Sequence, residues 1–144
     1  MVCDGNHCRS PIGEALLRER LEGRVAVASA GLTALDGIPA DPEVQRLMAD
    51  QGRDLSPHRG RQLTLELALD ADLILVMDSR QKEDCARLVP SARGRIYLLG
   101  HWQPEPDREI QDPFRQGTEA IQRAFQHISR AVEDWAPHLI NQQR

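Results

Sequence analysis

The sequence predicts an α/β fold with a parallel sheet, and three of its features carry that prediction. The 144 residues, 40% hydrophobic and 28% charged, are enough to bury a sizeable core without disulfides or structural metals. Segments typical of strands alternate with segments typical of helices, without repeats or linkers, so residues 1–144 are expected to form a single domain. Leu73–Met77 is apolar at every position, as a strand covered on both faces of a parallel sheet requires.

Two further strands and the end of a third are expected beside this one. Val25–Ser29 and Arg95–Leu99 are short and β-prone, and Ala30-Gly31 breaks the first of them. Only two residues precede Cys3, whereas strands usually have about five residues or more. The first strand is therefore expected to be truncated. We expect a natural start upstream, and a higher melting temperature for an N-terminally extended chain.

Helices are expected between the strands because proline, glycine or capping side chains mark their ends. The expected segments are Pro11–Glu22, Pro42 to the residue before Gly52, one or two turns within Thr64–Leu69, Ser79–Val89, and a last helix from Thr118. That last helix has an apolar stripe at steps of four, three, four and three: Ile121, Phe125, Ile128, Val132 and Trp135. The tail beyond Pro137 is expected to be frayed.

Charge and composition argue against several classes of protein. The net charge is −4, from 18 basic and 22 acidic side chains, and aromatic content is 3%, so nucleic-acid binding is not expected. No apolar run approaches the ~18 residues of a membrane helix, so membrane insertion is not expected. Three cysteines and no targeting segment favour a cytoplasmic protein. A monomer or a weak dimer is expected.

The loop before the first helix has the composition of a phosphate-binding cradle. It reads Cys3-Asp4-Gly5-Asn6-His7-Cys8-Arg9-Ser10-Pro11 and leads directly into the helix. Backbone N–H groups of such a loop, with the positive end of the helix dipole, can surround a tetrahedral oxyanion. Gly5 and Asn6 tolerate the necessary bend, and Arg9 would bind two phosphate oxygens with its guanidinium.

The same loop contains a candidate nucleophile, Cys3. An electropositive site lowers a thiol pKa from ~8.5 to ~3.5–7.5, which would make Cys3 a thiolate at neutral pH. Ser10 could donate its hydroxyl to the sulfur and help Cys3 leave when a phospho-enzyme is hydrolysed. Each residue alone also fits a structural role, with Cys3 and Cys8 as small buried hydrophobes. Their combination at the spacing Cys-x5-Arg-Ser favours a nucleophilic phosphate site.

This loop and the sequence around it resemble a known family, the low-molecular-weight protein tyrosine phosphatases. The signature is matched by Val2–Pro11, and the likeness continues through Ser29-Ala30-Gly31, Pro39-Ala40-Asp41, Ala71–Met77 and Asp112-Pro113-Phe114. The resemblance implies a three-layer, flavodoxin-like domain with a four-stranded parallel sheet. It also implies metal-independent hydrolysis of protein phosphotyrosine through a cysteinyl-phosphate intermediate, without a cofactor.

A phosphate monoester needs its leaving oxygen protonated, so the chemistry requires a carboxyl group besides the cysteine. The loop over residues 100–117 offers four: Glu105, Asp107, Glu109 and Asp112. The residues alone leave Asp112 and Asp107 both open, although Pro113 restricts the backbone of Asp112. The resemblance implies Asp112, which stands in the Asp-Pro motif.

The resemblance also implies a substrate wall and a partner. Phe114 and Leu35 are expected to line the slot above the cradle. Many relatives have an aromatic residue where this chain has Leu35, and Gly100-His101-Trp102 precedes the acid loop. Both features resemble the bacterial branch that dephosphorylates tyrosine autokinases of exopolysaccharide export. A phosphotyrosine protein of that kind is therefore the expected partner.

Three cradle residues need a separate account. In the family that the chain resembles, position 7 is usually a branched aliphatic residue in tyrosine-specific members and threonine in those acting on phosphoarginine, whereas this chain has His7. Asp4 places a carboxylate in a loop meant for an anion, and its side chain is expected to point away. Cys8 is close enough to Cys3 in a curled loop for a reversible disulfide that would protect the nucleophile.

Three other functions stay open on sequence grounds. One is a phosphoarginine phosphatase, and another is a non-catalytic module that binds phosphate. The third is an arsenate reductase, whose relay needs two further cysteines near the middle of the chain, where only Cys85 is available. No metal site is expected because no second ligand pair stands at zinc spacing. The joint presence of Cys3, Arg9, Ser10 and Asp112 favours the phosphatase.

Overall fold

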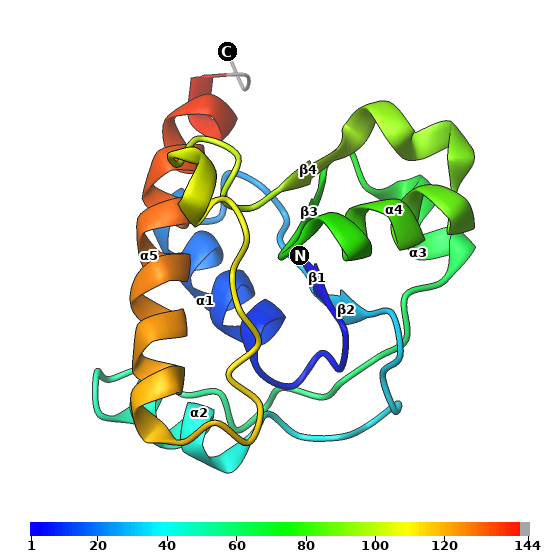
Figure 1. Cartoon of the computed structure of the whole chain (residues 1–144). Helices are drawn as coiled ribbons and strands as arrows, with labels where there is room; N and C mark the ends of the chain where they lie inside the picture. Colours follow the sequence, from blue (N-terminus) through cyan, green and yellow to red (C-terminus); the bar gives the residue numbers. More distant parts are fainter. Residues whose placement is uncertain (142–144) are drawn as a thin grey trace.

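Four short parallel strands form one sheet in the computed structural model, which describes residues 1–141 (Figure 1). Their order across the sheet is β2-β1-β3-β4. The strands are β1 (Val2–Cys3), β2 (Ala30–Gly31), β3 (Ile74–Val76) and β4 (Ile96–Leu98). Val2 lies opposite Ala30 on one side and Val76 on the other. The predicted four-stranded parallel sheet is confirmed.

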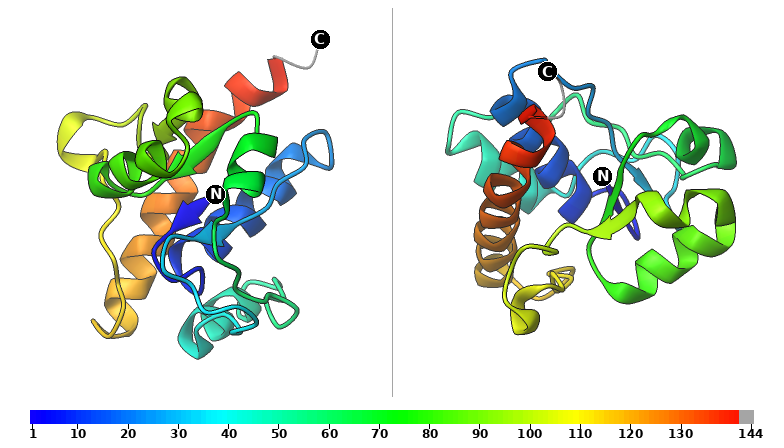
Figure 2. Two further views of the ribbon diagram at one scale, coloured as in Figure 1. Left: turned by 90° about the vertical axis from the view of Figure 1, so that its right-hand side faces the viewer. Right: turned by 90° about the horizontal axis from the view of Figure 1, so that it is seen from above.

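Helices cover both faces of this sheet and give the three layers expected. They are α1 (Arg9–Leu21), α2 (Pro42–Ala49), α3 (Leu65–Asp70), α4 (Ser79–Leu88) and α5 (Thr118–Asn141), with 3-10 turns η1 (Pro90–Arg95) and η2 (Glu105–Asp107). Helices α1 and α5 pack together on one side of the sheet, and α3 and α4 lie on the other (Figures 1 and 2). Within the described residues, no helix is both long and apolar enough to cross a membrane.

Two hydrophobic cores arise because successive side chains of a strand point to opposite faces. Leu75 and Met77 belong to the larger core, which α1, α2 and α5 cover. Ile74 and Val76 belong to the smaller core beneath α3 and α4. This alternation explains why the whole segment around β3 is apolar, since neither of its faces meets water.

The first edge of the sheet differs from the prediction. Residues 25–29 are not a strand, and β2 instead comprises Ala30 and Gly31, which were expected to break it. The reason is register, because the two residues of β1 pair with Ala30 and Gly31 and leave residues 25–29 beyond the ladder. A Cβ atom on Gly31 would also lie 2.5 Å from the carbonyl oxygen of Asp4, so only glycine permits this close pairing.

The end of the last helix also differs from the prediction. Helix α5 continues through Pro137 to Asn141 instead of fraying there, and residues 142–144 of the predicted tail lie outside the described residues. Pro137 removes one backbone donor, but Ala136 is fully buried, and Leu139 and Ile140 pack against the larger core. Tertiary packing therefore outweighs the local effect of the proline.

The topology brings three segments together at the carboxyl ends of β1 and β3. The chain order reverses between these two strands, and such switch points are where ligands bind on open α/β sheets. The loop after β1 and the N-terminus of α4 after β3 both reach this point. The segment after β4 joins them, because the N–H of Ile110 donates to the carbonyl of Met77 at 2.9 Å.

Candidate active site

The loop from Cys3 to Cys8 curls around the N-terminus of α1. No side chain caps this helix at Cys8, and the first turn contains no acidic residue. The first N–H groups of the helix therefore point into the loop without an intrahelical partner, as in other anion-binding helix ends. Both ends of the loop are pinned, since the Leu32 N–H donates to the Cys3 carbonyl and the Asp41 N–H to the His7 carbonyl.

Asn6 holds the loop in its bent shape. Its backbone is left-handed, with φ of 55°, and its side chain is fully buried. The amide nitrogen donates to the hydroxyls of Ser10 at 2.8 Å and Ser29 at 2.9 Å. The amide oxygen accepts from the backbone N–H of Arg61 at 3.0 Å. Every polar group of this side chain is therefore used to fix the cradle.

Three supporting residues around Asn6 were not predicted as site residues. Ser29 lies just before β2, and Arg61 donates from Nε to the Ser29 carbonyl at 2.9 Å. The Nε2 atom of His58 lies 2.7 Å from the carbonyl oxygen of Asn6. The sequence offered partial signals, since Ser29 begins the Ser-Ala-Gly motif and His58 and Arg61 form a polar cluster. Their contact with a loop some fifty residues away is visible only in the folded chain.

The sulfur of Cys3 is buried beside the hydroxyl of Ser10, with Sγ and Oγ 3.0 Å apart. Because Ser10 Oγ already accepts a hydrogen bond from Asn6, its own hydrogen is free to point at the sulfur. That arrangement stabilises a thiolate. Cys8 is a buried free thiol, and burial raises its pKa well above the ordinary value, so it stays protonated at neutral pH.

The guanidinium of Arg9 is buried among acceptors. Its Nη1 donates to the carbonyl of Ile110 at 2.7 Å. Carboxylate oxygens of three aspartates lie nearby, with Asp4 at 3.4 Å, Asp112 at 3.7 Å and Asp78 at 3.8 Å. None of these three carboxylates makes a short hydrogen bond with Arg9, so its guanidinium can still bind an incoming oxyanion closely.

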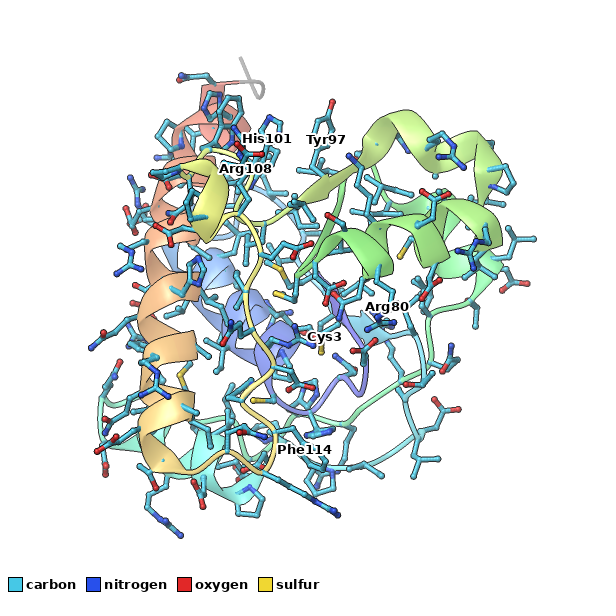
Figure 3. All side chains as sticks on the ribbon, viewed as in Figure 1. Cys3, Arg80, Tyr97, His101, Arg108 and Phe114 are labelled. Atoms are coloured by element: carbon cyan, nitrogen blue, oxygen red, sulfur yellow. The ribbon has the colours of Figure 1, made fainter. Side chains whose placement is uncertain are left out.

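The Asp4 side chain was expected to point away from the cradle, but it lies between Arg9 and Arg80. Both of its carboxylate oxygens accept hydrogen bonds from Nη2 of Arg80, at 2.6 and 2.7 Å. Burial alone would raise the pKa of Asp4, but hydrogen bonding to Arg80 and Gln81 and the charges of Arg80 and Arg9 lower it. Figure 3 shows Arg80 reaching from α4 toward the region of Cys3.

Only one of the four acidic candidates in the 100–117 loop has its carboxylate at Arg9. The backbone carbonyl oxygen of Asp107 lies 2.6 Å from Nε2 of His127, which holds this residue against α5. Glu109 turns toward α4 and accepts the Ser79 N–H at 2.8 Å. Glu105 is exposed in η2. Asp112 therefore has the best position among these residues to meet a group bound at Arg9.

The predicted wall residues are placed differently from each other. Phe114 packs edge to face against His7, with ring centroids 5.3 Å apart, so these two rings border the cradle together. Leu35 is 68% exposed in the loop after β2.

Cys85 belongs to the smaller core, across the sheet from Cys3, and burial raises its pKa to about 11. This position disfavours a redox relay between Cys85 and the cradle.

Comparison with known proteins agrees with this geometry. The profile of the family described as low molecular weight phosphotyrosine protein phosphatase matches residues 1–144. The chain belongs to this family. A relative from Ralstonia nicotianae, named probable low molecular weight protein-tyrosine-phosphatase EpsP, is 45% identical over 96% of this chain and 93% of its own length.

Solved structures of low-molecular-weight phosphatases share the fold of the chain. The crystal structure of the Erwinia amylovora tyrosine phosphatase AmsI is 37% identical, with a TM-score of 0.90 over 95% of this chain and 89% of that one. The tyrosine phosphatase Wzb from Escherichia coli K30, solved in complex with sulphate, is 41% identical. Its TM-score is also 0.90, over 96% of this chain and 94% of that one. The flavodoxin-like fold implied by the sequence is thereby confirmed.

Proposed function

We propose that this low-molecular-weight phosphatase hydrolyses protein phosphotyrosine with Cys3 as nucleophile, Arg9 as phosphate ligand and Asp112 as general acid and base. One observation supports the assignment above all. Cys3 Sγ lies 3.0 Å from Ser10 Oγ at the open end of α1, while Asp112 lies 3.7 Å from the Arg9 guanidinium. Nucleophile, anion ligand and proton donor therefore converge on one cradle.

The first step transfers the phosphoryl group to the enzyme. The Cys3 thiolate attacks phosphorus in line with the tyrosyl oxygen, an S–P bond forms, and the P–O bond breaks. The departing oxygen keeps the electron pair and takes the proton of the Asp112 carboxyl, so neutral tyrosine leaves. Arg9 and the N–H groups of the loop and of α1 hold the phosphoryl oxygens.

The second step restores the enzyme. Asp112, now a carboxylate, takes a proton from a water molecule that attacks phosphorus, and the S–P bond breaks. Cys3 leaves as a thiolate, which the Ser10 hydroxyl stabilises by donating a hydrogen bond. Inorganic phosphate departs, and Asp112 again carries the proton that the next cycle needs.

We also propose a tyrosine autokinase of exopolysaccharide export as the physiological substrate and the cytoplasm as the compartment. This proposal is supported by the sequence around Leu35 and Gly100-His101-Trp102, and by the exposure of Leu35 and Trp102 on the surface. The measurement is the rate of phosphate release from the tyrosine-rich tail of a cognate kinase. Release no faster than from unrelated phosphotyrosine peptides would contradict it.

Cys8 is proposed to protect the nucleophile during oxidation. Peroxide would oxidise the Cys3 thiolate to a sulfenic acid, and the Cys8 sulfur would displace water from it to form a disulfide. After peroxide treatment, mass spectrometry should find a Cys3–Cys8 link in the wild type and activity that returns with a thiol reductant. In Cys8→Ser, Cys3 should instead reach the sulfonic acid and stay inactive. Sulfonic acid at Cys3 in the wild type would contradict the role.

The deciding experiment is steady-state phosphate release from a phosphotyrosine peptide, without added metal, by the wild type, Cys3→Ser and Cys85→Ala. Turnover is expected in the wild type and in Cys85→Ala, whose side chain lies in the other core, and no turnover in Cys3→Ser. Turnover retained by Cys3→Ser would overturn the mechanism. A phosphoarginine peptide assayed in parallel tests the substrate class. Faster phosphate release from it than from the phosphotyrosine peptide would assign the enzyme to phosphoarginine instead.

A further inference from the structure

Asp4 poses an electrostatic problem for the phosphate site. It follows the nucleophile directly, and its carboxylate lies 3.4 Å from the guanidinium of Arg9. Asp112 and Asp78 also lie within 4 Å of Arg9, so three carboxylates surround one cation. Asp112 has the proposed role of proton donor, whereas Asp4 has no step to perform. A carboxylate beside Arg9 competes with the phosphate group for its guanidinium.

Arg80 is the group that engages this carboxylate. Its Nη2 donates to both oxygens of Asp4, and its Nη1 lies 3.1 Å from Asp84 on the same helix. The Asp4–Arg80 contacts of 2.6 and 2.7 Å are much shorter than the Asp4–Arg9 contact of 3.4 Å. Asp4 is therefore held mainly by Arg80 on α4 and keeps only a long hydrogen bond with Arg9.

We propose that Arg80 is a positioning residue that keeps Asp4 from occupying the phosphate site on Arg9. The inference rests on the proposed function, since it assumes that Arg9 binds the phosphoryl group. Arg9 Nη2 already donates a long hydrogen bond of 3.4 Å to Asp4 Oδ2, and without Arg80 a small rotation would shorten it to a charge-assisted bond of ~2.8 Å. The side chain of Arg9 is 3% exposed, so water competes little for its charge.

A tethered competitor has a distinctive kinetic effect. It occupies the guanidinium only while the site is empty, so saturating substrate displaces it and kcat stays nearly unchanged. KM and the inhibition constant for inorganic phosphate rise together. A merely structural role of Arg80 in the first turn of α4 predicts something else: lower kcat and a lower melting temperature, from displacement of Asp78 and of the Glu109–Ser79 contact.

The test compares Arg80→Gln with the double variant Asp4→Asn/Arg80→Gln. Affinity for inorganic phosphate is measured by calorimetry, and KM and kcat with a phosphotyrosine peptide. Arg80→Gln should weaken phosphate binding and raise KM about tenfold, with kcat within about twofold, because Asp4 would then make a close bond to the buried Arg9 guanidinium that phosphate must displace. The double variant should recover most of that loss, because the neutral amide no longer competes for Arg9.

Arg87→Gln is the matched control. Arg87 lies on the same helix and also pairs with Asp84, at 3.3 Å, but it does not contact the cradle. It removes the same charge, so an effect of the protein's net charge alone would appear in both single variants. Phosphate affinity and KM in Arg87→Gln should stay within about twofold of the wild type, since exposed pairs contribute little.

Several outcomes would overturn the proposal. They are unchanged phosphate affinity in Arg80→Gln, an equal loss in Arg87→Gln, or a double variant as weak as Arg80→Gln. A failure of the proposed function looks different, because the wild type would then bind phosphate without turnover while the calorimetric comparison still decides the role of Arg80. Wild-type protein that binds no phosphate would overturn both.

Discussion

The cradle and the acid loop are two segments of one site that the fold holds in opposite ways. In the cradle Cys3, Asn6 and Cys8 are buried, and Asn6 has all its side-chain polar groups bonded inside the protein. The loop that carries Asp112 is exposed, and the Asp112 side chain itself is 49% open to solvent. Its contacts with the rest of the protein include the Ile110 N–H and the Glu109 carboxylate before Asp112, and the Phe114 ring on His7 after it.

This difference separates two tasks. Binding an oxyanion requires N–H groups that are already aimed before the ligand arrives, and a loop fixed by the buried hydrogen bonds of Asn6 provides them. Moving a proton requires a carboxyl group that meets both the leaving oxygen and water, so partial exposure suits Asp112. Changes in the acid loop should therefore alter the rate without altering phosphate binding, and changes in the cradle should alter stability as well.

The strongest test of the comparison is Asp112→Asn. Loss of the proton donor should lower kcat by about 10² to 10⁴, the usual contribution of general acid–base catalysis, while the affinity for inorganic phosphate stays within a few-fold. Asp107→Asn is the matched control, because it stands in the same loop with its carboxylate away from Arg9. A larger fall of kcat in Asp107→Asn than in Asp112→Asn would assign the role of general acid to Asp107.

The cradle side of the comparison is tested by Asn6→Ala. This variant loses three hydrogen bonds of a buried side chain and places alanine at a left-handed φ of 55°. Unfolding free energy should fall by about 2–4 kcal/mol, and phosphate affinity should fall with it. Denaturant unfolding and calorimetry measure the two effects.

Arg115→Gly is the counterpart of that variant in the acid loop. Arg115 also has a left-handed backbone, with φ of 58°, but it is exposed and follows the acid motif. Glycine there relieves the φ without removing a buried hydrogen bond, so stability should change by no more than about 0.5 kcal/mol. Equal destabilisation by Asn6→Ala and Arg115→Gly would remove the distinction between the two loops.

Sequence reasoning predicted the parts of this molecule that depend on local pattern. The apolar run around β3, the capped helices and the Cys-x5-Arg-Ser spacing each carry their information within a few residues. The same reasoning misplaced β2, because the register between Val2 and Ala30 depends on a partner strand far along the chain. It also ended α5 at Pro137, because the contacts of the partly buried Leu139 and Ile140 with the larger core are tertiary.

Sequence reasoning did not predict the supporting residues of the site, for the same reason. Arg80 follows β3 by a few residues and looks like an ordinary exposed helix cation, and 76 residues separate it from Asp4. His58 looks like a polar turn residue until the fold places it against the Asn6 carbonyl. Motifs point to the residues that we propose for the chemistry, whereas those that hold them in place come from whichever segments the topology brings near.

The last prediction concerns Asp4, which belongs to the cradle but has partners on α4. Its folded-state pKa is lowered by Arg80, Gln81 and Arg9, so its charge stabilises the fold above the unfolded pKa of ~3.9. That contribution is lost as pH falls through the lower, folded-state pKa. The wild type should exceed Asp4→Asn in stability by about 1 kcal/mol or less at pH 6, since the pair is partly exposed, and the gap should narrow toward pH 3. Urea unfolding of both proteins at the two pH values measures this gap. A gap that widened on acidification would mean that the Asp4 carboxylate, despite its two short contacts with Arg80, is destabilising where it lies.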